Sequence, residues 1–286
     1  MVVVRDIIIT GLLLGGIFAL VSVGFSLQYG VGRVLNVSHG EFIMLGSFIT
    51  FWLLGSANIN PLVSMLVSGV FVFAIGWFLY ATLFRRLMDT SPSIEAFEGK
   101  SMLAAFGLLY VVQNLARIIW GSQTQNVIFL NRTVTAAQIP LNRLVALGVV
   151  IVISALFYLF LARTRMGKAI RAAGQDPTTA GLMGVNIHGV LAICFGLGLG
   201  MAGVAGSLIS TVYAISTSMG LQYTVIAMIV VVLGGLGSVT GAMIGGLVLG
   251  VVSQLVTYFQ PTMTFIAYYA IFIVLLLVRP KGIMGK

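Results

Sequence analysis

The chain has 286 residues, of which 59% are hydrophobic and only 7% are charged. A soluble domain carries about 25% charged residues, so this composition excludes a soluble globular protein and predicts a surface that faces lipid. The net charge of +9 comes from basic residues at the ends of apolar runs. That placement sets membrane orientation and indicates no nucleic-acid partner.

Continuous apolar runs follow one another along the chain and exclude a β-barrel, whose strands alternate apolar and polar residues. They predict an all-α, polytopic membrane helix bundle with about eight to nine transmembrane segments, including broken or re-entrant helices. We expect one transmembrane domain over residues 1–286. The runs cover residues 7–29, 38–54, 61–84, 101–120, 143–162, 190–210, 222–236, 240–258 and 263–278.

Lysine and arginine concentrate in loop 85–100, in loop 163–189 and in the tail from Arg279. An even number of runs separates these regions, so the positive-inside rule assigns all three to the cytoplasm. We therefore expect a multi-pass membrane protein with a cytoplasmic C-terminus. If every run spans, the N-terminus is outside; if run 38–54 is re-entrant, it is inside.

The first interruption of the apolar pattern follows Tyr29 and precedes run 38–54. At 100° per residue, one small and polar helical face there is formed by Asn36, His39, Gly40, Ser47 and Thr50. Paired, glycine-interrupted segments point to a transport site at the membrane midplane, so we predict that this face lines a solute path. His39 has no second ligand at metal-binding spacing, and we expect no metal site.

Ser38 and Glu41 stand three residues apart, as in a capping box, where each side chain binds the other's backbone N–H. Glu41 therefore has two interpretations. It either starts the helix as a cap, or it is a functional acid, because acids at membrane depth are rare and usually matter.

The second interruption of the apolar pattern comprises Gly234, Gly235, Gly237 and Ser238. We predict that these residues also line part of the solute path. The alternative interpretation is a plain cytoplasmic turn between two helices. Elsewhere, small residues at four-residue spacing, such as Gly198, Ala202 and Gly206, predict closely packed helices.

Loop 163–189 contains a predicted helix of about two turns at 177–183. Asp176 suits its N-cap, Pro177 its first position and Gly184 the residue after its end. Leu182 and Met183 would then be exposed. We expect this helix to insert into a groove of a soluble partner; the alternative is a membrane-surface helix held by anionic lipid.

Nothing in the sequence has the spacing of a nucleotide-binding, hydrolase or metalloenzyme motif. We therefore expect no catalysis and no cofactor in this chain, and any energy for active transport would come from separate subunits.

Taken in order, four stretches resemble the H-type permease subunit of branched-chain amino acid ABC importers. They are residues 11–50, with Gly11-Leu12-Leu13-Leu14-Gly15-Gly16; residues 171–206, with Gly184-Val185-Asn186; residues 234–250; and the ending Arg279-Pro280-Lys281-Gly282-Ile283-Met284-Gly285. The sequence departs from the family at Val37 and Ser38, where the family usually has Phe and Ala.

This resemblance implies a heterodimer with a second permease subunit, two cytoplasmic ATPase subunits and a periplasmic solute-binding protein. It also implies that the protein lies in the bacterial inner membrane. The solute would be a branched-chain amino acid or a similar small polar molecule, such as urea, an amide or a small organic acid. ATPase coupling would use Arg171, Asp176, Pro177, Ala180, Leu182, Met183 and Gly184. A secondary transporter or a channel is the alternative, although Glu41 is the one candidate acid for ion coupling.

Overall fold

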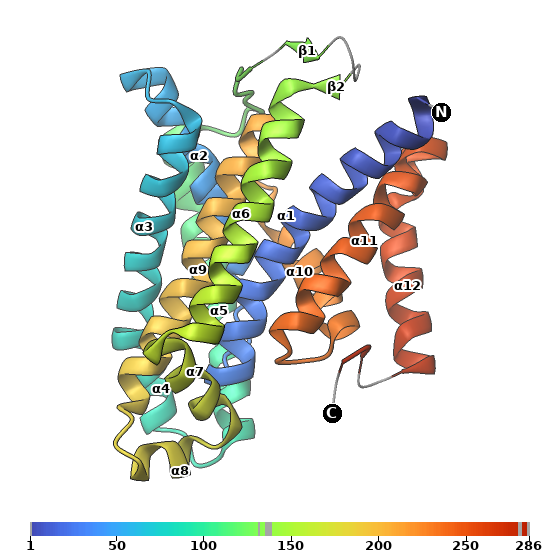
Figure 1. The fold of residues 1–286 in the computed structure, drawn as a ribbon. Coiled ribbons are helices and arrows are strands. Elements are labelled where there is room, and N and C mark those ends of the chain that lie inside the picture. Colours follow the sequence, from blue (N-terminus) through green and yellow to red (C-terminus); the bar gives the residue numbers. More distant parts are fainter. Residues whose placement is uncertain (1, 131, 135–138, 280–281, 285–286) are drawn as a thin grey trace.

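The computed structural model describes residues 2–130, 132–134, 139–279 and 282–284. The predicted tail residues Pro280, Lys281, Gly285 and Lys286 lie outside this described part. Helices account for nearly all of the regular structure (Figure 1). The strands in the described residues are β1 (Thr133–Val134) and β2 (Ile139–Pro140), which pair antiparallel. The prediction of an all-α bundle is confirmed.

The longer helices pack into one bundle. They are α1 (Val2–Gly32), α2 (His39–Ala57), α3 (Pro61–Leu79), α5 (Ile94–Trp120), α6 (Leu141–Arg163), α9 (Ile187–Val212), α10 (Gly220–Gly234), α11 (Val239–Phe259) and α12 (Thr264–Val278). Among them, α3, α6 and α9 run nearly parallel to one another, while α1 and α11 cross obliquely (Figure 1). Shorter elements are the π-helical turn Tyr80–Phe84, which joins α3 to α4 (Arg85–Asp89), together with α7 (Arg165–Gln175), α8 (Pro177–Leu182) and the 3₁₀ turn Pro261–Met263.

Eight helices in the described part of the chain are long and apolar enough to cross a membrane. Helix α10 has 15 residues, and at 1.5 Å per residue it falls short of a hydrocarbon core about 30 Å thick. The predicted range of eight to nine segments therefore holds. Helix α2 continues to the junction with α3, at the end of the bundle opposite α7 and α8 (Figure 1). Run 38–54 is consequently not a re-entrant loop.

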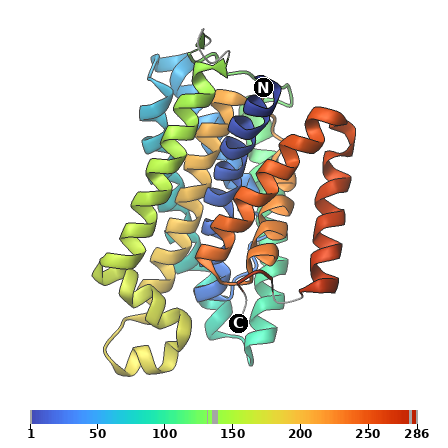
Figure 2. The ribbon, with the colours of Figure 1, turned by 45° about the vertical axis from the view of Figure 1, so that its right-hand side comes forward.

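The two ends of the chain lie at opposite ends of the bundle. The start of α1 lies at the end that carries β1 and β2, whereas the C-terminal segment lies at the end that carries α7 and α8 (Figures 1 and 2). An odd number of crossings produces this arrangement. Eight long helices plus the short α10, extended by the non-helical residues 213–219, give nine.

The bundle is built around α1 and α9. In the apolar, membrane-spanning parts of α1 and α9, 72% and 78% of the residues are buried. The corresponding shares are 17% for α5 and 6% for the span Pro261–Val278, which contains α12. Both central helices are followed by a non-helical stretch and a helix that starts inside the bundle: 33–38 before α2, and 213–219 before α10. Helix α1 packs on α11, and α9 packs on α3. The segments α1–α3 and α9–α11 thus have matching connectivity and run in opposite directions, an inverted repeat of the kind found in transporters.

Glycines make the central crossings possible. A Cβ on Gly24 of α1 would lie 2.5 Å from the carbonyl oxygen of Gly198 on α9, and a Cβ on Gly46 of α2 would lie 2.1 Å from the carbonyl oxygen of Gly203. Backbones that approach this closely leave no room for a side chain. The expected close packing through small residues is confirmed at these crossings.

Candidate functional site

The N-termini of α2 and α10 meet inside the bundle. A Cβ on Gly40 would lie 1.8 Å from the carbonyl oxygen of Gly220, so the two helix starts touch backbone to backbone. Thr224 joins them: its Oγ1 accepts a hydrogen bond from the Gly40 N–H at 2.8 Å and donates one to the Val37 carbonyl at 3.0 Å. Each helix start carries partial positive charge from its free N–H groups.

Glu41 lies at this meeting point. Its side chain is fully buried, and neither carboxyl oxygen has a hydrogen-bond partner. A Cβ on Gly220 would lie 2.4 Å from the Glu41 carboxyl group, so the acid is packed directly against the first residue of α10. Burying a polar group without a partner is costly, and such a group therefore calls for a functional explanation.

The prediction of a capping box at Ser38 and Glu41 is wrong, because neither side chain makes the hydrogen bond to backbone N–H that a capping box requires. Ser38 is the N-cap of α2, but its hydroxyl donates to Asn36 Oδ1 at 2.6 Å and makes no cap bond. The reason is the backbone of Ser38, with φ −79° and ψ 2°, because an N-cap side chain reaches the helix amides from extended backbone. Glu41 is left without the role of a helix cap.

The predicted polar face is brought together along α2, but its side chains bond to neighbouring helices. Asn36 donates to Gln28 Oε1 at 3.2 Å, and His39 Nε2 lies 3.1 Å from the Val21 carbonyl oxygen. Ser47 donates to the Gly206 carbonyl at 2.7 Å. These contacts fasten the first part of α2 to α1 and its middle to α9.

A cluster of three buried hydroxyl groups joins α2, α3 and α9. Thr50 Oγ1 donates to Ser207 Oγ at 2.8 Å, and Ser68 Oγ forms a hydrogen bond with the same Ser207 oxygen. All three side chains are at most 1% exposed. Thr50 and Ser47 thus face packed helices in this conformation, and their place on a solute path stays a prediction.

The late glycine segment forms the turn between α10 and α11. Gly235 and Gly237 have φ values of +103° and +81°, which suit glycine, and Ser238 caps α11 by accepting from the Gly241 N–H at 3.0 Å. The turn lies at the end that carries α7 (Figure 2). A Cβ on Gly30, near the end of α1, would lie 2.7 Å from the Gly237 Cα atom.

In the inverted repeat, the counterpart of the early interruption at residues 33–38 is the stretch of residues 213–219 that precedes α10. Sequence reasoning missed this second interruption because residues 213–219 contain no glycine and are rich in hydroxyl residues. A usable signal was present: the run 222–236 is too short to span, and the polar stretch Ser216-Thr217-Ser218 precedes it.

The predicted helix in loop 163–189 is confirmed as α8. Asp176 caps it by accepting from the N–H groups of Thr178 and Thr179. Hydrogen bonds from the side chain and backbone of Thr179 hold the pKa of Asp176 below its ordinary value. Leu182 and Met183 are 84% and 81% exposed, as expected.

Helix α7 was not predicted. Thr164 caps its N-terminus, and its buried face consists of Gly167, Ile170 and Ala173. The three-residue spacing of these positions, after a threonine, was the available signal. Arg171, one of the predicted coupling residues, donates to the Leu161 carbonyl of α6, and so holds α7 against the end of that helix.

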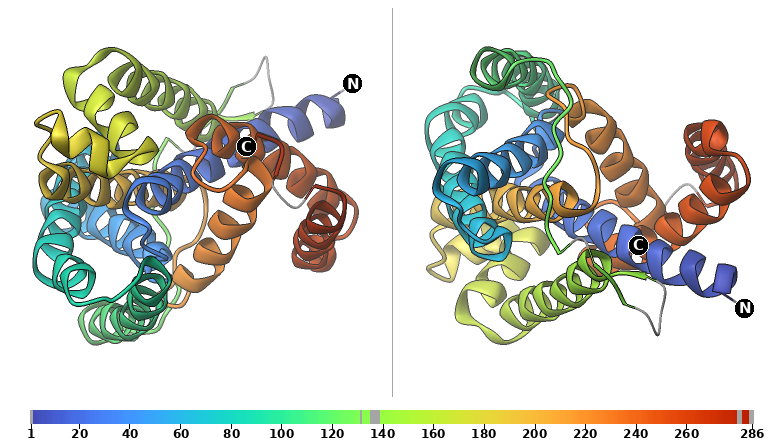
Figure 3. Two further views of the ribbon diagram at one scale, coloured as in Figure 1. Left: turned by 90° about the horizontal axis from the view of Figure 1, so that it is seen from below. Right: turned by 90° about the horizontal axis from the view of Figure 1, so that it is seen from above.

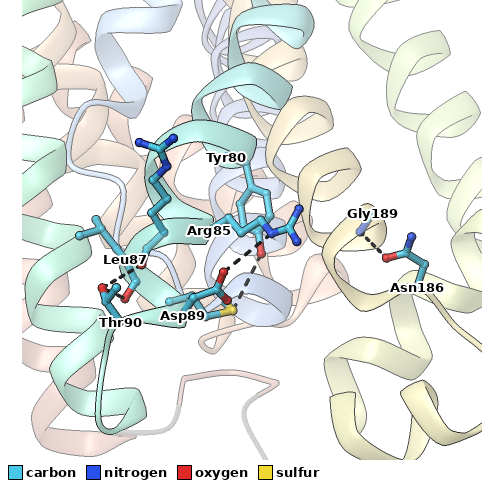
Figure 4. A network of polar contacts seen from close by, with 9 residues as sticks. Tyr80, Arg85, Leu87, Asp89, Thr90, Asn186 and Gly189 are labelled. Atoms are coloured by element: carbon cyan, nitrogen blue, oxygen red, sulfur yellow. Dashed lines mark hydrogen bonds and ion pairs between the residues drawn. The ribbon is translucent and has the colours of Figure 1, made fainter.

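Charged residues of α4 lie at this same end of the bundle. Arg85 and Asp89 form an ion pair at 3.8 Å, close to the start of α9, where Asn186 caps the helix by accepting from the Gly189 N–H (Figure 4). A cavity of about 390 Å³ opens between α1, α6, α7 and the α10–α11 turn. Its lining includes Gly30, Arg171 and Gly237.

The sequence matches known transport proteins along nearly its whole length. Residues 7–278 match the family model for the branched-chain amino acid transport system / permease component. The chain is 30% identical to the high-affinity branched-chain amino acid transport system permease protein LivH of Escherichia coli K12, over 96% of this chain and 94% of that protein. It is 28% identical to BraD of Pseudomonas aeruginosa, a permease protein of the same description, over 98% and 95%.

A more distant relative is the fructose import permease protein FrcC of Rhizobium meliloti, 26% identical over 77% of this chain and 62% of that protein. No solved structure matches. The match to the family model covers nearly the whole helix bundle, including both interrupted crossings. The chain therefore belongs to the family of permease components of branched-chain amino acid ABC transport systems.

Proposed function

We propose that this chain is the transmembrane subunit of an ATP-binding cassette importer and forms part of the path for a branched-chain amino acid or a similar small polar solute. A periplasmic binding protein delivers the solute, and a second, paralogous permease completes a heterodimer. In this proposal residues 1–286 act as one transmembrane domain in a bacterial inner membrane. The end with α7, α8 and the C-terminus is cytoplasmic, in keeping with its many lysines and arginines.

One observation carries the proposed solute site: Glu41 is fully buried without a hydrogen-bond partner, against the start of α10. An amino acid is a zwitterion, so its site must offer a negative and a positive group. The Glu41 carboxylate would receive the ammonium group. The free N–H groups at the start of α10 would receive the carboxylate, as half-helices do in other transporters.

The remaining predicted path residues take positions around this site. Gly40 allows α10 to touch α2, Asn36 lies just before the start of α2, and His39 is its first residue. Ser47 and Thr50 would form a wall that α9 holds in place. Towards the cytoplasm, the turn of Gly234, Gly235, Gly237 and Ser238 would border the exit, because Gly237 lines the cavity at that end.

The cytoplasmic coupling element would be α8. Its exposed Leu182 and Met183 are apolar and stand beyond the membrane helices, so they fit a groove in an ATPase subunit. The cap formed by Asp176 and Pro177, the buried Ala180 and the left-handed Gly184 (φ +85°) would keep α8 in shape. Arg171 would hold α7, the helix that precedes α8, against the end of α6. ATP hydrolysis would take place on the ATPase subunits, and this chain would be no enzyme itself.

Uptake by the whole transporter, reconstituted in proteoliposomes with its binding protein, tests the solute site. We expect Glu41→Gln to abolish leucine uptake, because a neutral amide cannot pair with an ammonium group. Glu95→Gln, an exposed position at the start of α5, is the matched control and should transport normally. Normal leucine uptake by Glu41→Gln would contradict the proposed site.

A second experiment tests the coupling element. We expect the double variant Leu182→Asp, Met183→Asp to bind less ATPase and to lose ATP-driven uptake. Ile128→Asp places a charge on a similarly exposed residue at 79%, in the loop after α5 at the opposite end of the bundle, and should retain uptake. Unchanged uptake in the double variant would remove α8 from the proposed docking surface.

A further inference from the structure

The loop that follows α5 crosses the end of the bundle that carries β1 and β2. Seen from above, it runs over the bundle beside the non-helical stretch 213–219, which leads from α9 into α10 (Figure 3). An isolated β-bridge joins the two segments. The N–H of Gln125 donates to the Ile215 carbonyl at 2.8 Å, and the N–H of Ile215 donates to the Gln125 carbonyl at 2.9 Å. Two segments far apart in the chain are thus paired backbone to backbone.

Two further contacts fasten the start of this loop. Thr217, which is 2% exposed, donates from its hydroxyl to the Gly121 carbonyl at 3.3 Å. The ring of Trp120, the last residue of α5, stacks on the buried ring of Phe48 in α2, with the ring centroids 5.1 Å apart. We call residues 120–125 the α5 strap. The α5 strap is therefore attached to α2 on one side and to the stretch that precedes α10 on the other.

The two attachments of the α5 strap lie on the two elements that enclose Glu41. Phe48 follows Glu41 by seven residues, which is about two turns along the same helix. Ile215 precedes Gly220 by five residues, and Gly220 is the first residue of α10, packed against the Glu41 carboxyl group. Holding residue 215 in place consequently limits how far the start of α10 can move away from Glu41.

A solute can reach Glu41 only if one of these elements moves, because Glu41 is fully buried. In the described residues, the hydrogen bonds that join α2 to α10 directly all involve Thr224. The α5 strap adds two backbone bonds and a hydroxyl bond to the hold on α10, from the end that carries β1 and β2. Each such bond contributes little net free energy, since water can replace either partner once the segments part.

We propose that the α5 strap is a gate over the solute site. Its bonds to residues 213–219 keep the start of α10 against α2, and they break to let α10 move away and expose Glu41 towards the end with β1 and β2. The proposal rests on the proposed function, which places the solute at Glu41. In this assignment Gln125 and Thr217 are positioning residues, which act on the site through α10 and do not touch the solute.

A disulfide across the β-bridge tests the gate. Residues that exchange both backbone bonds have Cα atoms about 5.5 Å apart, within the range of about 4.4–6.8 Å that a disulfide spans. We expect the double variant Gln125→Cys, Ile215→Cys to lose leucine uptake in proteoliposomes on oxidation and to regain it on reduction. The single native cysteine, Cys194, is 1% exposed and does not compete.

The double variant Thr133→Cys, Pro140→Cys is the matched control. These two residues are partners in the antiparallel pair of β1 and β2, at the same end of the bundle but outside residues 120–125 and 213–219. A disulfide between them should leave leucine uptake unchanged.

A second experiment loosens the gate instead of locking it. Gln125→Pro removes the N–H that donates to Ile215, whereas the matched control Gln125→Ala keeps it. Met219→Cys, at a position 6% exposed next to the start of α10, serves as the reporter in the assembled transporter. A membrane-impermeant maleimide should label it about fivefold faster with Gln125→Pro, the factor that one lost hydrogen bond allows, and at the unchanged rate with Gln125→Ala.

Unchanged leucine uptake by the oxidised Gln125→Cys, Ile215→Cys variant would overturn the proposal. Equal labelling of Met219→Cys with Gln125→Pro and Gln125→Ala would also overturn it. If the reduced double variant fails to transport because Ile215 is a core residue, the labelling comparison decides alone. Uptake that survives the disulfide refutes the gate and leaves the proposed function standing, whereas normal uptake by Glu41→Gln refutes the solute site itself.

Discussion

The crossing of α2 and α9 gives the sharpest prediction, because it depends on two glycine backbones. In Gly46→Ala the new Cβ would lie 2.1 Å from the Gly203 carbonyl oxygen, well inside the 3.0 Å that real Cβ atoms keep. Both groups are backbone, so no side chain can swing aside. Overpacking costs about 1–3 kcal/mol, and about 2–3 kcal/mol of that range applies where, as here, neither contacting group can move aside; alanine regains about 1 kcal/mol of helix propensity. We expect a net loss of about 1–2 kcal/mol.

Cys194 provides the assay for Gly46→Ala. It is the single cysteine, it is 1% exposed, and it lies in α9. A thiol-reactive fluorogenic dye therefore reports the melting of this helix in detergent. At about 2–4 °C per kcal/mol for a chain of this size, the midpoint should fall by about 2–8 °C.

Gly55→Ala is the matched control on the same helix. A Cβ at residue 55 would meet nothing within 4 Å, so only the gain in helix propensity remains. Its midpoint should equal or exceed that of the unsubstituted protein. If Gly46→Ala melts as high as Gly55→Ala, the α2–α9 contact is looser than the structure has it and the reasoning is refuted.

Three other substitutions probe the hydroxyl cluster and α8. Ser207→Ala removes the hydroxyl that joins α2 to α3 and should cost about 1 kcal/mol, read as a lower melting midpoint. Hydrogen bonds from Thr179 lower the pKa of Asp176. The carboxylate therefore caps α8 fully at any pH above the ordinary aspartate pKa of about 3.9. The cap is lost as the pH falls through the lowered pKa. A spin label at Met183 should become more mobile over that fall, but should not respond to pH in Asp176→Asn. Gly184→Ala strains a residue at φ +85° and should raise the label's mobility at neutral pH.

Local chemistry made α8 predictable. Asp176, Pro177 and Gly184 each satisfy a requirement of a helix end that depends on a few neighbouring residues. The membrane helices were predictable for a similar reason, since length and apolarity suffice. Helix α7 was not predicted because charged residues such as Lys168 interrupt its apolar pattern, and its buried face around Ile170 is short.

The surroundings of Glu41 could not be predicted, because they depend on residues far away in the chain. The sequence pattern pairs Glu41 with Ser38, three residues away, whereas the fold packs it against Gly220. The surroundings of the predicted polar face on α2 could not be predicted for the same reason. Ser47 and Thr50 look free on an isolated helix, and their partners, Gly206 and Ser207, come from α9. A periodic pattern identifies a face but does not identify the helix that covers it.

The bonds around α2 also indicate how the site at Glu41 would open. Helix α2 is fastened to α9 by Ser47 and Thr50, whereas the hydrogen bonds between α2 and α10 in the described residues all pass through Thr224. Moving α10 away from α2 therefore breaks fewer bonds than moving α2 away from α9.

The far end of α10 is linked to the proposed coupling region. The C-terminal segment bonds to it, with the N–H groups of Ile283 and Met284 donating to the carbonyls of Leu233 and Gly234. Gly237, in the turn that follows, lies against Gly30 of α1, and a Cβ on Gly174 of α7 would meet Val31 beside it at 3.4 Å. Packed elements can carry coupling over such distances where they have two arrangements. A shift of α7 and α8 on an ATPase would thus act on α10, the helix with the weakest hold on the site.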